Sequence, residues 1–161
     1  MKRTLLAFSG ALALALQMAH PAGAQSPHCT GGWEITGYFV PQESDYARDH
    51  LTRIGGRPLP TGFVRAVRLE GFGLTNAGDY LGYDGAYHKQ PLTSTGLPLS
   101  ASVDPRVIRY GTQFTIDGQT FVASDTGGAI RGKHIDLFMG YGRAAERAMQ
   151  SLGKKQVTVC L

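Results

Sequence analysis

Short β-favouring runs, each closed by turn residues, constrain this chain more than any other feature of its sequence. Asp117-Gly118 lies between the runs 113–116 and 119–123 and predicts a tight β-hairpin. Residues 33–40 are largely β-branched and aromatic and end at Pro41, so we expect a strand there. With 22 glycines and 8 prolines among 161 residues, the chain is too rich in helix-breaking residues for a helical bundle. The sequence therefore predicts a mainly β protein, with a small barrel as its architecture.

The other expected elements are short. In the region 63–71, Val64, Ala66 and Val67 are interspersed with charged residues, which we interpret as a strand. We further predict a short helix at 44–51, short strands among long loops from 72 to 100, a strand-like apolar run at 135–139, a helix at 143–152 and a final strand at 156–160. We expect a single domain over 25–161, with a core at 101–161 and a loop-rich region at 41–100.

The N-terminal segment has the form of a secretory signal peptide. Lys2 and Arg3 precede an apolar run, and Ala22-Gly23-Ala24 supplies small residues at the cleavage positions. The run is shorter than the roughly 20 residues of a membrane-spanning helix. We therefore expect residues 1–24 to be removed after Ala24, and the mature protein to be periplasmic or secreted, without stable insertion in a membrane.

The two cysteines fit an exported protein. Cys29 lies near the expected mature N-terminus, and Cys160 is the penultimate residue. Their separation is unlike the spacing of zinc ligands, so in an oxidising compartment we expect a disulfide that joins the two ends of the chain. The alternative is a pair of buried thiols.

Charge and motifs exclude several function classes. The formal net charge is only +4, and two of these charges lie in the expected signal peptide, so a dense basic face for nucleic acid is not indicated. No glycine-rich phosphate loop is found between a strand and a helix. The histidines of the mature chain show no ligand spacing (His28, His50, His88 and His134). We expect no metal ion and no cofactor.

Three aspartates, Asp104, Asp125 and Asp136, follow or interrupt apolar runs that we expect to be buried. A carboxylate in such a place is unfavourable unless it is paired, hydrogen-bonded or protonated. Asp104 could instead cap a turn before Pro105, and Asp125 could form an Asx turn. A purely structural role is least expected for Asp136, because an aspartate is unusual within a strand-like apolar run. The remaining candidates are expected to be turn or solvated residues (Asp79, Asp84, Asp117 and Glu146).

The segment 123–138, Ala-Ser-Asp-Thr-Gly-Gly-Ala-Ile-Arg-Gly-Lys-His-Ile-Asp-Leu-Phe, closely resembles the three-aspartate (3D) domain of the membrane-bound lytic transglycosylase A family. Gly140-Tyr-Gly142 and an alanine-rich helix follow it, as in that domain. Upstream, residues 103–112 resemble the strand that carries the family's first aspartate, and residues 37–41 resemble its first strand more weakly.

This resemblance implies a six-stranded double-psi β-barrel with one or two short helices, acting as a monomer on the glycan strands of peptidoglycan. By resemblance, Asp136 is the catalytic acid/base, and Asp125 and Asp104 line the same cleft. The predicted reaction cleaves the MurNAc-GlcNAc bond and leaves a 1,6-anhydro-muramyl end. Carboxyl groups that lie close together cannot all ionise easily, which would keep one of them protonated.

Several other residues are expected to contact the glycan. Gly127 and Gly128 would let the backbone approach the sugar. His134 would hydrogen-bond it, and Tyr38 is one of several tyrosines that could stack on a sugar face (also Tyr80, Tyr83 and Tyr87). The family has a large second domain that forms the other wall of its groove, and residues 44–100 are too few to build it.

Two other functions remain open at this point. A non-catalytic glycan-binding barrel would use the aspartates only to hold loops. Asp125-Thr126-Gly127 is also the triplet of aspartic proteases, which need two copies and hence a dimer. That interpretation leaves Asp104 and Asp136 unexplained.

Overall fold

The computed structural model describes residues 28–91 and 99–161. The predicted signal peptide and its cleavage site lie outside the described residues. Within the described part, no helix has the length and apolar character needed to cross a membrane.

Six strands form a closed barrel, as predicted. They follow one another around it in the order β1 (Cys29–Val40), β10 (His134–Tyr141), β7 (Ser100–Val103), β9 (Gln119–Asp125), β8 (Gln113–Ile116) and β11 (Lys155–Cys160). β1 pairs with β10, and β7 with β9, in parallel, whereas the other neighbours are antiparallel. Parallel neighbours need crossover connections, so hairpins alone cannot close this barrel.

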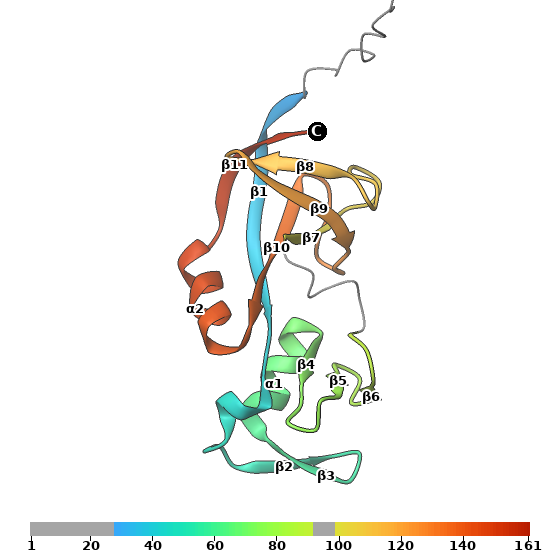
Figure 1. Cartoon of the computed structure of the whole chain (residues 1–161), viewed down its shortest axis with the longest axis vertical. Helices are drawn as coiled ribbons and strands as arrows, with labels where there is room; N and C mark the ends of the chain where they lie inside the picture. Colours follow the sequence, from blue (N-terminus) through green and yellow to red (C-terminus); the bar gives the residue numbers. More distant parts are fainter. Residues whose placement is uncertain (1–27, 92–98) are drawn as a thin grey trace, which may run out of the picture.

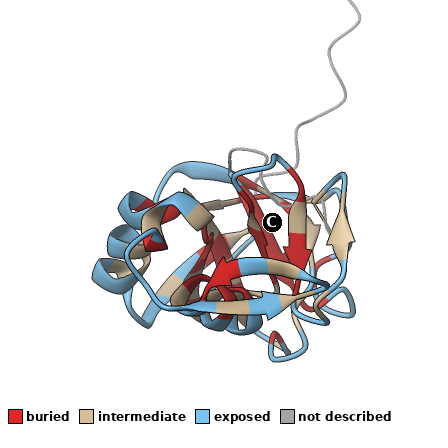
Figure 2. Cartoon of the chain, turned by 90° about the horizontal axis from the view of Figure 1, so that it is seen from below, coloured by how far each residue is buried: buried red, intermediate tan, exposed pale blue. Residues whose placement is uncertain are grey.

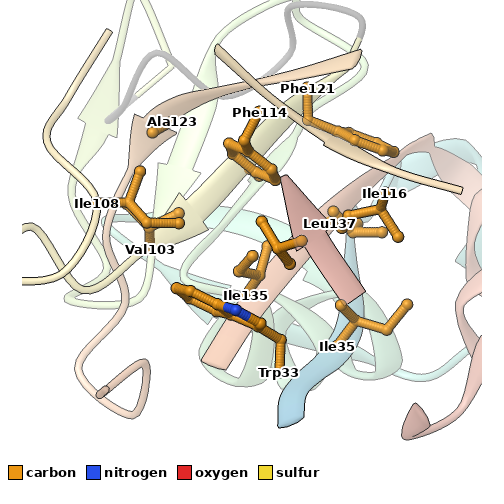
Figure 3. Close-up of a cluster of buried hydrophobic side chains, with 12 residues drawn as sticks. Trp33, Ile35, Val103, Ile108, Phe114, Ile116, Phe121, Ala123, Ile135 and Leu137 are labelled. Carbon is orange, nitrogen blue, oxygen red and sulfur yellow. The ribbon is translucent and has the colours of Figure 1, made fainter. Parts of the chain in front are cut away.

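The barrel interior is filled by apolar side chains from all six strands (Figure 3). Ile135 and Leu137 of β10 are buried there, so the alternation of side chains along a strand turns Asp136 to the other face of the sheet. The predicted hairpin is present, with Asp117 at φ 50° and Gly118 at φ 79°, as a type I′ turn requires. The barrel's apolar pattern thus places Asp136 outside the core.

The predicted disulfide between Cys29 and Cys160 is formed. It links the first residue of β1 to the last residue of β11, and the two cysteines are paired in the antiparallel register. α2 (Gly142–Leu152), close to its predicted bounds, packs against β1 and β10. The barrel is therefore closed by a covalent bond between its two terminal strands.

Residues 42–91 build a smaller part beside the barrel, reached directly from the end of β1 (Figure 1). It contains a 3-10 helix η1 (Glu43–Tyr46), β2 (Leu51–Ile54), β3 (Arg57–Pro60), α1 (Thr61–Glu70), β4 (Phe72–Leu74), β5 (Tyr80–Gly82) and β6 (Tyr87–His88). This region, predicted to be loop-rich, has an apolar core of its own, made of Tyr46, Leu59, Phe63, Val64, Val67 and Leu81.

Buried strand segments lie at the centre of the molecule, whereas α2 exposes its outer face (Figure 2).

The strand predicted at 63–71 is wrong, because this segment is the helix α1. Its buried residues, Phe63, Val64 and Val67, lie on one helical face rather than alternating. Gly71 ends the helix at φ 98° and donates its N–H to the carbonyl of Val67. The predicted helix at 44–51 is likewise only the short η1, at 43–46.

Candidate active site

A cavity of about 590 Å³ is lined by the barrel and by the smaller part together. The barrel contributes Asp136, Thr36 and the loop that follows β9, and the smaller part contributes the end of α1, Phe72 and Tyr83. This volume lies within the range of about 300–1,000 Å³ that is usual for ligand sites. The smaller part therefore supplies a second wall, although the sequence has too few residues for a large second domain.

Asp136 lies near the start of β10, between Thr36 of β1 and Ser102 of β7 in the register. The Thr36 hydroxyl donates a hydrogen bond of 2.6 Å to Asp136 Oδ1. Burial raises the pKa of Asp136, and the charge of Asp125 raises it further, while Thr36 and His134 oppose the shift. The carboxyl group thus keeps its proton to a higher pH than an exposed aspartate does, as a general acid requires.

His134 contacts the site through Thr36 and does not line the cavity. Its Nε2 lies 2.9 Å from Thr36 Oγ1. Because the single hydroxyl hydrogen of Thr36 goes to Asp136, the Thr36 oxygen accepts a hydrogen bond from Nε2–H. His134 Nε2 also lies 3.9 Å from Glu34 Oε1. The chain His134–Thr36–Asp136 fixes the orientation of the carboxyl group.

Asp125, Gly127, Gly128 and Tyr38 all line the same cavity as Asp136. A register shift between β7 and β9 places Asp125 opposite Ser102, and its Oδ1 accepts the N–H of Thr126 at 2.7 Å. A Cβ atom on Gly127 would lie 2.9 Å from Ile130 Cγ1, so the loop is tightly folded at this glycine. The structure thus brings together four of the predicted site residues around Asp136.

Asp104 is placed differently from the expectation that it lines the cleft. It is 3% exposed and does not line the cavity. Its Oδ2 accepts hydrogen bonds of 2.8 Å from Arg106 Nη2 and from the Gly132 N–H, which hold the pKa of its carboxyl well below the usual range. Asp104 thereby ties the end of β7 to the segment that leads into β10.

Glu70, which the sequence interpretation missed, also lines the cavity. It is the last residue of α1, and its Oε2 accepts the N–H of Phe39 at 3.4 Å. Burial raises the pKa of Glu70 to about 7, assisted by the charges of Asp136 and Glu146. Because Glu70 follows Val67 by three positions and Phe63 by seven, helical spacing could have placed it on the buried face of α1.

Comparisons with known proteins agree with this fold. The family model described as 3D domain matches residues 100–161, from β7 to the C-terminus, so the chain carries a 3D domain there and the resemblance is confirmed. The curated proteins contain no sequence that matches the chain.

Solved structures match over most of the chain. One is a crystal structure of Escherichia coli MltA with bound chitohexaose, at 14% identity and a TM-score of 0.58, covering 81% of this chain and 71% of that one. Another, of MltA from Escherichia coli, is described as a unique lytic transglycosylase fold; it has 13% identity and a TM-score of 0.53, covering 79% of this chain and 70% of that one. At these identities the likeness establishes the fold.

Proposed function

We propose that the chain is an exported lytic transglycosylase that cleaves the MurNAc-GlcNAc bond of peptidoglycan, with Asp136 as its general acid. The observation that carries the proposal is the half-buried carboxyl group of Asp136, which faces a cavity and is held by Thr36. The matched structures of a lytic transglycosylase, one of them with bound chitohexaose, support the reaction class and a glycan ligand. The disulfide and the predicted signal peptide support a periplasmic or secreted location.

In the proposed reaction, Asp136 protonates the glycosidic oxygen as the bond to the anomeric carbon of MurNAc breaks. The C6 hydroxyl of the same sugar attacks that carbon, which gives a 1,6-anhydro product without consuming water. The Asp136 carboxylate can then accept the proton of this hydroxyl in turn. General acid catalysis of this kind contributes about 10²–10⁴ in rate.

The neighbouring residues have supporting roles in this proposal. Thr36 engages one oxygen of Asp136, so the other oxygen carries the proton toward the cavity. The charge of Asp125 helps to keep that proton on Asp136. Gly127 and Gly128 bring the backbone close to the sugar. Asp104 is a positioning residue, because it holds Gly132 in the segment before β10.

A glycan-binding barrel without catalysis is the second candidate. It is favoured by Leu69 and Tyr83, which are 77% and 66% exposed at the cavity. Such exposed apolar and aromatic side chains can cover a sugar face without any chemistry.

Mass spectrometry of the products released from purified sacculi distinguishes the two candidates. The mature protein is compared with Asp136→Asn and with Asp84→Asn, a matched change at a turn aspartate that accepts the N–H of Ala86 and does not line the cavity of Asp136. We expect anhydro-muramyl products from wild type and from Asp84→Asn, and none from Asp136→Asn. Sacculi that bind the wild-type protein but release no products would instead support the binding barrel.

A further inference from the structure

Glu70 reaches the cavity from the smaller part of the molecule. It ends α1 in the smaller part, whereas Asp136 and Asp125 belong to the barrel, and all three line one cavity. Among the described residues, its carboxyl group accepts only the long hydrogen bond of 3.4 Å from Phe39 N–H. A half-buried carboxyl group with so little hydrogen bonding is unusual unless a ligand group completes it.

The strand β1 contacts both carboxyl groups. Thr36 donates to Asp136, and Phe39, three positions further along the same strand, donates its N–H to Glu70. Both carboxyl groups are thus held by one strand and line the same cavity.

The surroundings of Glu70 bring its titration close to neutral pH, where its ionised form can accept a proton. Burial raises its pKa to about 7, and the negative charges of Asp136 on β10 and Glu146 on α2 act in the same direction. The other titratable groups around it are Tyr46 of η1 and, lining the cavity, Tyr38, Arg68, Tyr83 and Asp125. A group that titrates near the working pH suits proton transfer.

We propose that Glu70 is a second catalytic carboxyl group of this cavity, which takes the proton of the attacking hydroxyl while Asp136 protonates the leaving oxygen. This assignment rests on the proposed transglycosylase function and divides its two proton transfers between two residues. The bond between C1 of MurNAc and O4 of GlcNAc breaks, and O4 takes the proton of Asp136. The C1–O6 bond forms with an electron pair of O6, whose proton moves to Glu70. Solvent then returns a proton from Glu70 to Asp136, so neither water nor a co-reactant is consumed.

The test is the pH dependence of product release from sacculi by wild type, Glu70→Gln and Glu43→Gln. Glu43 is a matched control, because it also accepts a backbone N–H, that of Asn76 at 2.8 Å, but lies outside the cavity. Glutamine keeps an acceptor for Phe39 N–H, so a merely structural Glu70 would tolerate the change. We expect kcat of Glu70→Gln to fall by about 10²–10⁴, while binding of chitohexaose and the activity of Glu43→Gln are unchanged.

The shape of the pH profile provides a second readout. Wild type should give a bell-shaped profile, whereas Glu70→Gln should keep only the limb that falls as Asp136 loses its proton. A Glu70→Gln variant with the rate and profile of wild type would overturn the role of Glu70 and return both transfers to Asp136. An inactive wild-type protein would overturn the proposed function itself, so the two failures are distinguishable.

Discussion

Replacing Thr36 with valine tests how the protein controls the protonation of Asp136. Valine matches threonine in shape but lacks the hydroxyl that donates to Asp136 Oδ1 at 2.6 Å. A hydrogen bond to a charged group contributes about 1.5–3 kcal/mol. Because about 1.4 kcal/mol corresponds to one pKa unit, its loss should raise the pKa of Asp136 by roughly one to two units. The direction is upward because the hydroxyl stabilises the ionised form.

The assay is a carbon-13 NMR titration of the aspartate carboxyl groups in wild type and Thr36→Val. Thr158→Val, at an exposed position of β11, is the matched control and should leave the Asp136 titration unchanged. The pKa of Asp136 is already above the ordinary value in the folded protein, so folding is favoured where Asp136 is protonated. This contribution is lost as the pH rises through the folded pKa, and the variant should be less stable than wild type above that pH. An unchanged or lowered pKa of Asp136 in Thr36→Val would refute the reasoning.

Three further variants test other parts of the account. Asp104→Asn should be less stable than wild type at neutral pH and equal to it in strong acid, as measured by thermal unfolding, because a lowered pKa gives stability that disappears as the pH falls. A difference that persists in strong acid would contradict this. Cys29→Ser should lower the free energy of unfolding by about 2–5 kcal/mol in a denaturant titration, since the disulfide spans 131 residues. Tyr83→Ala, at the exposed rim, should raise KM for sacculi with kcat unchanged, and a fall in kcat alone would argue against a binding role.

Much of the barrel could be predicted because its signals are local. The Asp117-Gly118 turn needs two positive φ angles, and these residue types provide them. The apolar neighbours of Asp136 belong to the barrel core, and the alternation along β10 explains why this aspartate faces outward. The disulfide could be predicted just as directly, because Cys29 and Cys160 lie near the two ends of the expected mature chain.

The smaller part was harder to predict because its order depends on tertiary packing. Over so few residues, the apolar pattern around Val64 and Val67 is compatible with a strand or a helix. The packing of this segment against β4 favours the helix α1. A Cβ atom on Gly73 would lie 2.6 Å from Val67 Cγ2, so α1 approaches the backbone of β4 directly at this glycine. The strand prediction for 63–71 does not place Glu70 on the buried face of a helix, so Glu70 is missing from the predicted site residues. The contacts of Asp104 with Arg106 and Gly132 likewise depend on the folded loop.

The central claim, that Asp136 acts as acid while the sugar's own hydroxyl attacks, is tested most directly by digestion of sacculi in water enriched in oxygen-18. The account predicts that wild-type protein releases anhydro-muramyl products that carry no label, and that Asp136→Asn releases none. Labelled reducing-end products would contradict it, because they would mean that water, rather than the C6 hydroxyl, attacks the anomeric carbon.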